Sequence, residues 1–205
     1  MYEEIIRNLR TAYDQRVEER DSKEVLNWKV EEREAFLKLL LQENKTRLLE
    51  IGTGPGVHAK YFQERGLEVV CIDLSPEMVK RCNEKGLKAY EMDFQHLAFP
   101  ESEFEAIHAM NCLLHVPREN LSRALQEIYR VLRVKGLFYW GQYGGVEQAG
   151  VYEEDHYRPK RFFSFLRDDQ LKKIAEGYFK IYSFKTIELE TEENFHFQVL
   201  TLRKE

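Results

Sequence analysis

The sequence predicts an α/β fold: a doubly wound, mostly parallel sheet of seven strands with helices on both faces. Short apolar runs alternate along the chain with segments of helical periodicity, which is the pattern of consecutive strand–helix units. The last two strand-like runs are separated by only a short acidic link, ETEE at 190–193. A parallel pair needs a crossover of about a dozen residues, so the chain is expected to end in an antiparallel hairpin.

Five strands are expected before that hairpin, each a short apolar run bounded by polar residues or glycine. They cover residues 46–51, 67–73, 87–93, 104–110 and 136–143. A helix is expected from about Pro55, and another starts with Ser75 as its N-cap and Pro76 in its first position. A third carries a stripe at 4-3-4 spacing, formed by Leu121, Leu125, Ile128 and Leu132.

The two ends of the chain complete the expected domain. Residues 2–43 contain no glycine or proline and are predicted to form two helices with a break near Asp21 and Ser22. The hairpin strands are 178–189 and 194–202, and the second alternates Phe195, Phe197 and Val199 against His196 and Gln198. We expect one domain over 1–205, divided into an N-terminal helical cap (1–44), a core (45–143), a connection or lid (144–170), and a helix with the terminal hairpin (171–205).

Composition limits the class of protein. The chain has 205 residues, of which 43% are hydrophobic, which is enough for one well-buried core. Its net charge is −5 and it has no basic run, which disfavours a nucleic-acid-binding protein. The three cysteines form no CxxC pair, and neither a signal peptide nor a membrane span is expected. These features predict reduced thiols and a cytoplasmic protein without a metal site.

The segment EIGTGPG, residues 50–56, predicts a ligand-binding loop between a strand and a helix. A dinucleotide-binding loop reads GxGxxG, but the spacing here is GxGxG and Val57 occupies the position of the third glycine. Pro55 also removes an N–H donor where a pyrophosphate would need one. A nicotinamide-dependent oxidoreductase is therefore disfavoured, and a plain strand–helix turn stays a further alternative.

The run LLEIGTGPGVHAKYFQERGLEVVCIDLSPEMVKRC, followed by YEMDFQHLAFPESEFEAIHAMNCLLHVPRENLSRALQEIYRVLRVKGLFYW, resembles the class I S-adenosylmethionine-dependent methyltransferases. The resemblance covers residues 47–140, and the terminal hairpin agrees with it. It implies S-adenosylmethionine as cofactor, held by Glu50, Gly52, Thr53, Gly54, Gly56, Asp73, Leu74, Met78, Asp93, Phe94 and Asn111.

The resemblance also implies a place for each contact. The glycines would pass close to the methionine part of the cofactor, and Asp73 would accept hydrogen bonds from both ribose hydroxyls. Leu74 and Met78 would pack on the adenine. Asp93 would accept from the adenine amino group, although an aspartate there also suits an ordinary turn. Phe94 would add a backbone donor and an apolar wall, and residues 111–115 would lie beside the sulfonium.

Methyl transfer from a sulfonium needs mainly alignment, and it needs a base only where the acceptor must lose a proton. His115 is the candidate base, because histidine titrates near neutral pH. The alternative, which we favour, is that His115 fixes its loop through a hydrogen bond. His156 and Tyr157, in the expected lid, are a second possibility for a catalytic role.

The acceptor class is predicted less directly. No Pro-Pro-Tyr motif follows the fourth strand, where the sequence reads NCLL, so methylation of DNA amino groups is disfavoured. With an acidic chain and a helical cap that carries Tyr13 and Trp28, a small-molecule acceptor is our preferred hypothesis, in a monomer or homodimer. The alternative from another class is a cofactor-binding partner or regulator that does not catalyse transfer.

Overall fold

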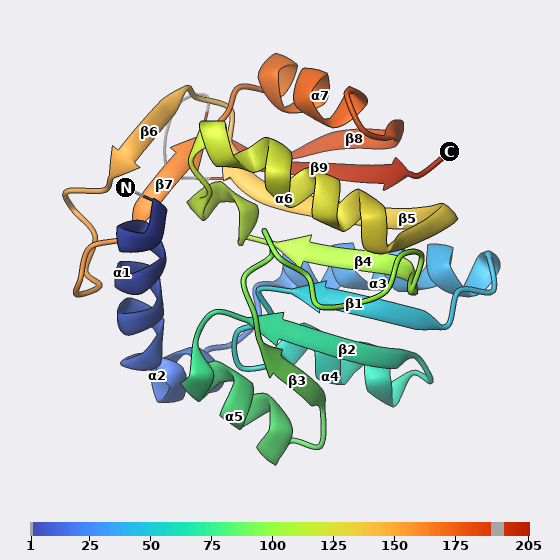
Figure 1. Cartoon of the computed structure of the whole chain (residues 1–205), viewed down its shortest axis with the longest axis horizontal. Helices are drawn as coiled ribbons and strands as arrows, with labels where there is room; N and C mark the ends of the chain where they lie inside the picture. The colour runs from blue at the N-terminus through green and yellow to red at the C-terminus, as the bar shows by residue number, and fades with distance from the viewer. Residues whose placement is uncertain (1, 190–194) are drawn as a thin grey trace.

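The computed structural model of the chain describes residues 2–189 and 195–205. Its main sheet has seven strands in the order β3-β2-β1-β4-β5-β9-β8 (Figure 1). They are β1 (Arg47–Ile51), β2 (Glu68–Asp73), β3 (Lys88–Glu91), β4 (Phe104–Met110), β5 (Leu132–Gly144), β8 (Lys180–Glu188) and β9 (His196–Arg203). Neighbours from β3 to β5 are parallel, and β9 is antiparallel to both β5 and β8. The predicted fold class is confirmed, while the ETEE link lies outside the described residues.

Helices cover both faces of this sheet (Figure 1). One face packs against α3 (Asn27–Gln42), α4 (Val57–Glu64) and α5 (Pro76–Glu84), and the other against α6 (Arg118–Val131) and α7 (Asp168–Glu176). Successive side chains of a strand point to opposite faces, so β1 contributes to both cores. Leu48 packs in the core that contains Phe36, whereas Leu49 packs in the core that contains Ile128.

The N-terminal region differs from the two predicted helices. It forms three, α1 (Tyr2–Asp14), α2 (Val17–Ser22) and α3, with the expected break after Ser22 and a further one at residues 15 and 16. In Figure 1, α1 runs across the carboxyl ends of the parallel strands. α3 belongs to the layer on the sheet instead, because Phe36, Leu37 and Leu40 are buried against it. The cap therefore consists of α1 and α2 alone.

Three further predictions about individual helices and strands need correction. β5 begins at Leu132, which the helical stripe had assigned to the preceding helix. The segment 144–170 contains a second small sheet, made of β6 (Gln148–Val151) and β7 (Phe162–Phe165), whose four-residue strands lack a clear sequence signal. Gln198 is fully buried because the segment that leads into α7 covers it, and its side chain donates to the Leu166 carbonyl and to Asp168, so both faces of β9 are covered at this position.

Two searches of the described residues bear on function. No helix among them is long and apolar enough to cross a membrane. Within the same residues, no group of three or more histidine, cysteine, aspartate or glutamate side chains is placed to hold a metal ion.

Candidate functional site

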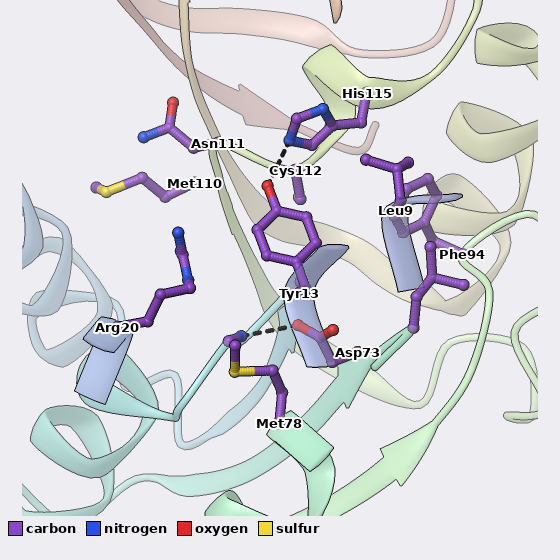
Figure 2. Close-up of a pocket in the computed structure, with 13 residues that line it drawn as sticks. Leu9, Tyr13, Arg20, Asp73, Met78, Phe94, Met110, Asn111, Cys112 and His115 are labelled. Carbon is purple, nitrogen blue, oxygen red and sulfur yellow. Dashed lines mark hydrogen bonds between the residues drawn. The ribbon is translucent and has the colours of Figure 1, made fainter. Parts of the chain in front are cut away.

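A pocket opens where β1, β2 and β4 end, below α1 (Figure 2). Its free space, counted together with its open mouth, is about 580 Å³. This edge is where open parallel sheets bind ligands, beside the point at which the strand order reverses between β1 and β4. The lining residues are Leu9, Tyr13, Arg20, Gly52, Gly54, Asp73, Leu74, Met78, Phe94, Met110, Asn111, Cys112 and His115.

The glycine loop forms part of the pocket floor. Gly52 has φ +65°, and a Cβ there would lie 2.4 Å from the Cβ of Cys112, so a side chain is excluded by both conformation and space. Gly54 also has a positive φ and lines the pocket, with the Arg20 guanidinium as the nearest neighbour of a Cβ at this position. Gly56 lies outside the lining and instead begins α4, packed closely against Cys82.

Asp73, at the end of β2, is the acidic group of the floor. Its Oδ2 accepts from the Gly54 N–H at 2.8 Å and its Oδ1 accepts from the Ser75 N–H at 2.9 Å. Burial raises the pKa of Asp73, and these two hydrogen bonds oppose that rise. The carboxylate is thereby fixed in orientation, and each oxygen keeps a lone pair for a ligand hydroxyl.

The residues predicted for the adenine divide between the pocket and its outer edge. Leu74, Met78 and Phe94 line the pocket. Asp93 does not, because its carboxylate accepts from the Tyr2 hydroxyl at 3.0 Å and 3.1 Å and from the Gln95 N–H. Its proposed contact with the adenine amino group stays a prediction.

Glu50 and Thr53 lie beneath the loop rather than in the pocket. Both are buried, and the Thr53 hydroxyl donates to Glu50 Oε2 at 3.4 Å. Any effect of these two residues on a ligand therefore passes through the backbone of the loop.

The segment after β4 forms the far wall. Asn111 has φ +60° and donates its N–H to the Gly141 carbonyl. His115 ends the short helix η1 (Leu113–His115), with Nδ1 2.7 Å from the Phe162 carbonyl oxygen and Nε2 2.7 Å from the Tyr13 hydroxyl. A carbonyl can only accept, so Nδ1 carries the proton and Nε2 accepts from Tyr13.

Burial lowers the pKa of His115 to about 3, and the nearby cation Arg161 acts in the same direction. The neutral ring is therefore stable, and both of its nitrogens already hold hydrogen bonds. This arrangement supports the loop-fixing interpretation of His115 over that of a free base.

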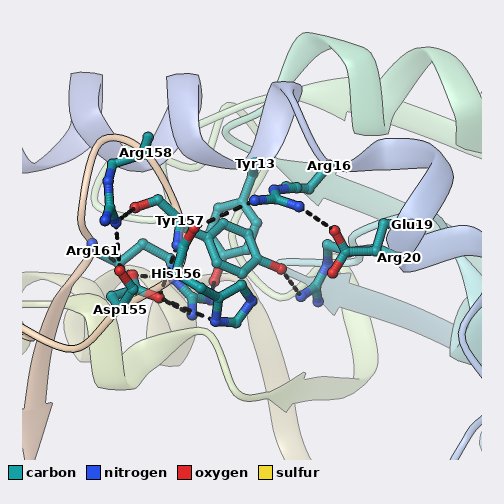
Figure 3. A network of polar contacts seen from close by, with 9 residues as sticks. All are labelled: Tyr13, Arg16, Glu19, Arg20, Asp155, His156, Tyr157, Arg158 and Arg161. Atoms are coloured by element: carbon teal, nitrogen blue, oxygen red, sulfur yellow. Dashed lines mark hydrogen bonds and ion pairs between the residues drawn. The ribbon is translucent and has the colours of Figure 1, made fainter.

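A network of polar and aromatic side chains forms the roof (Figure 3). Asp155 and Arg161 make a double contact, Nε to Oδ2 at 2.9 Å and Nη2 to Oδ1 at 3.0 Å. The Arg161 guanidinium lies 3.6 Å from the centre of the Tyr157 ring and donates to the Tyr13 hydroxyl. The loop between β6 and β7 is thus joined directly to α1.

His156 and Tyr157 both belong to this roof and not to the lining. The His156 side chain is 68% exposed and does not line the pocket. Tyr157 is buried, and its hydroxyl accepts weakly from Arg20 at 3.4 Å. Their catalytic role stays a prediction, with a packing role evident for Tyr157.

Three lining residues were not predicted: Leu9, Arg20 and Met110. Of the three, Arg20 carries a charged group that can donate hydrogen bonds to a ligand. It lies in α2 beside Gly54, its Nε is buried without a hydrogen-bond partner, and it has no ion pair within the described part of the chain. In the sequence it is one arginine in the charged run RVEERD, so no local signal distinguishes it.

Comparison with known proteins shows a match to a protein family and to several curated relatives. A methyltransferase domain family matches residues 49–140. An uncharacterized methyltransferase of Schizosaccharomyces pombe is 26% identical over 71% of this chain and 64% of its own length. Phosphoethanolamine N-methyltransferase of Plasmodium falciparum is 29% identical over 56% of this chain and 45% of its own length. The chain thus spans less than two thirds of either relative.

A solved structure extends the likeness of fold to the whole chain. It is the 1,6-didemethyltoxoflavin-N1-methyltransferase of Burkholderia thailandensis, with bound 1,6-didemethyltoxoflavin and S-adenosylhomocysteine. The TM-score is 0.77 at 19% identity, covering 100% of this chain and 90% of that one. The family match, the ordered motifs and the sheet topology therefore agree on a methyltransferase domain over residues 49–140, and the solved structure shows that the whole chain shares its fold.

Proposed function

We propose that this chain is an enzyme that transfers the methyl group of S-adenosylmethionine to a small-molecule acceptor. The observation that carries the proposal is the pocket itself, which joins Gly52 and Gly54, the fixed carboxylate of Asp73 and the unpaired cation of Arg20. Transfer is an in-line displacement at carbon, and the leaving thioether needs no proton. The protein's contribution is to align the two reactants and to exclude water.

The floor of the pocket would hold the cofactor. The two oxygens of Asp73 suit the two ribose hydroxyls, while Leu74, Met78 and Phe94 supply an apolar slot for the adenine. Arg20 would bind the methionine carboxylate, because a guanidinium pairs well with a carboxylate and this one lies beside the glycine loop. Tyr2 would either keep its hydrogen bond to Asp93 and cover the outer edge of the adenine, or release Asp93 to accept from the adenine amino group.

The roof and far wall would hold the acceptor. His115 is neutral and fully hydrogen-bonded, so it is a poor proton acceptor at neutral pH. This favours a nucleophile that needs no deprotonation, such as a neutral amine, a ring nitrogen or a carboxylate. Two of the similar proteins above are named for N-methylation of small molecules, which agrees with this class.

The cellular setting is part of the proposal. All three cysteines are buried and unpaired, which suits a reducing compartment such as the cytoplasm. A monomer or homodimer stays our prediction for the assembly.

The test is transfer of a labelled methyl group. Purified chain would be incubated with methyl-labelled S-adenosylmethionine and a panel of small amines, heteroaromatic nitrogen compounds and carboxylates. We expect label in one class of acceptor together with stoichiometric S-adenosylhomocysteine. Tight binding of S-adenosylhomocysteine with no transfer to any acceptor would instead support the non-catalytic alternative.

A further inference from the structure

A row of polar side chains crosses the sheet directly beneath the glycine loop. The strand registers pair Glu50 of β1 with Cys71 of β2 on one side and with His108 of β4 on the other. His108 in turn pairs with Tyr139 of β5. All four lie on the face that α3 and α4 cover, whose other residues form an apolar core.

This row is buried, and it is not fully hydrogen-bonded. Glu50 is 3% exposed and His108 is fully buried, with Glu50 Oε1 3.3 Å from His108 Nδ1. Among the described residues, neither ring nitrogen of His108 has a hydrogen-bond partner, and neither does the Tyr139 hydroxyl. Buried polar groups without partners are costly, so their presence inside an apolar face points to a use.

Glu50 is the member of the row connected to the cofactor loop. It accepts from the Thr53 hydroxyl, and Ala59 in the first turn of α4 lies near it. Gly52 and Gly54, which line the pocket, lie on either side of Thr53. A change in the charge of Glu50 therefore acts on the loop from below, although Glu50 does not itself line the pocket.

Burial, which raises the pKa of Glu50, outweighs the opposing effects of His58 and Arg33. The Arg33 guanidinium stacks on the Tyr61 ring at 3.8 Å and forms no ion pair with Glu50. The groups that face Glu50 from the packed elements are Arg33 of α3, His58 of α4, His108 of β4, Cys71 of β2, Cys82 of α5 and Cys112 after β4.

The titration behaviour of these groups singles out Glu50. Burial raises the pKa of Glu50 to about 7 and lowers the pKa of both His58 and His108 to about 3. Burial also raises the pKa of the three thiols. At neutral pH the imidazoles and thiols are uncharged, and Glu50 is the group poised to exchange a proton.

We propose that Glu50 is a positioning residue that gives up its proton to solvent when the cofactor binds, so that cofactor affinity rises with pH through neutrality. The inference rests on the proposed function, because it requires the ammonium group at the methionine end of the ligand, which S-adenosylhomocysteine also carries, to lie on the glycine loop. A positive charge above the loop favours the ionised carboxylate below it. Because binding releases a proton, higher pH favours the bound state.

The experiment is calorimetric titration of the full chain with S-adenosylhomocysteine between pH 6 and pH 7.5, in two buffers that differ in ionisation enthalpy. The difference in heat between buffers counts the protons released. For the wild type we expect a release of about half a proton near pH 7 and an affinity up to about tenfold higher at pH 7.5 than at pH 6. The number of protons released on binding is measured on the wild-type protein alone.

Two variants test whether the released proton comes from Glu50. Glu50→Gln should bind with no proton release and with an affinity that does not change with pH. Glu32→Gln is the matched control, since Glu32 is a buried carboxylate of α3 that pairs with Lys185, and it should behave as the wild type. Lys29, whose pKa burial lowers to about 8, and Asp73 are left unchanged in both variants.

The outcomes separate the two claims. Binding without proton release, or release that persists in Glu50→Gln, overturns the assignment of Glu50 and leaves the proposed function intact. Failure of S-adenosylhomocysteine to bind at any pH overturns the proposed function together with this inference.

Discussion

The floor and the roof of the pocket are built in different ways. The floor is made of strand ends and backbone, as in the bond from the Gly54 N–H to Asp73, two residues on adjacent strand ends. The roof is made of side chains that meet from distant parts of the chain. Tyr13 of α1 contacts His115, 102 residues away, and Arg161, 148 residues away (Figures 2 and 3).

This difference suits the two reactants of a methyl transfer. The cofactor is common to the family, so a floor fixed by backbone geometry can remain the same while acceptors differ. Side-chain contacts between α1, α2 and the loop 152–161 can change without disturbing the sheet. We therefore expect substitutions in the floor to act on cofactor binding, and substitutions in the roof to act on closure and local stability.

The largest effect is expected from Asp73→Ala. The variant loses two hydrogen bonds from ribose hydroxyls to a charged acceptor, so S-adenosylhomocysteine should bind about 2–4 kcal/mol more weakly. Calorimetric titration measures the change. The control is Glu91→Ala, at the end of β3, whose half-exposed carboxylate pairs with Arg10 outside the pocket. Equal affinities for Asp73→Ala and wild type would remove the ribose assignment.

The next effect concerns Arg20, the one roof residue that we assign to the cofactor. Arg20→Met should weaken S-adenosylhomocysteine by about 1.5–3 kcal/mol, the range for a hydrogen bond to a charged group. An analogue without the methionine carboxylate should bind wild type and variant equally. Arg7→Met is the matched control, since Arg7 is an exposed arginine of α1 that does not line the pocket. An equal loss for the analogue would show that Arg20 acts on something other than the carboxylate.

A smaller effect should appear in the pH dependence of stability. The pKa of His115 lies far below its ordinary value in the folded protein, so the unfolded chain binds a proton that the folded chain does not. Stability from this residue is present above about pH 6.5 and is lost as pH falls. Between pH 7 and 5.5 the unfolding free energy of wild type should drop by about 1 kcal/mol more than that of His115→Gln. Urea titrations that give parallel pH profiles for both proteins would contradict the neutral, buried imidazole.

The smallest effect is expected for Tyr13→Phe. The change removes the hydroxyl that donates to His115 and accepts from Arg161, at a cost of about 0.5–1.5 kcal/mol. Amide hydrogen exchange should become a few times faster in α1 and stay unchanged in β1 and β4. Tyr61→Phe in α4 is the control, because within residues 2–189 and 195–205 Tyr61 accepts a hydrogen bond through its backbone carbonyl but makes none through its hydroxyl. Faster exchange throughout the sheet would mean that α1 is not a separately closing element.

The same contrast explains what the sequence could predict. The Ser75 cap, with Met78 N–H donating to its hydroxyl, and the strand at 104–110 are local features, and both were predicted correctly. Gly52, Gly54 and Asp73 were proposed from the resemblance, which rests on a local run of motifs, and all three line the pocket. Arg20 and the Asp155–Arg161 pair gave no such signal, since their partners are chosen by tertiary packing.

Two errors have the same physical origin. The β6–β7 hairpin consists of strands too short to show a period, and residues 144–170 therefore looked like an irregular connection. α3 was grouped with the cap because helical periodicity shows that a face is buried but not what covers it. Glu50 was assigned to the cofactor from the resemblance; it lies outside the pocket lining, and its contact with the cofactor stays a prediction.

The most direct test of the central claim is a pair of titrations of the wild-type chain, one with S-adenosylhomocysteine and one with NADH. We expect saturable heat with S-adenosylhomocysteine and none with NADH. Saturable binding of NADH with no response to S-adenosylhomocysteine would contradict it.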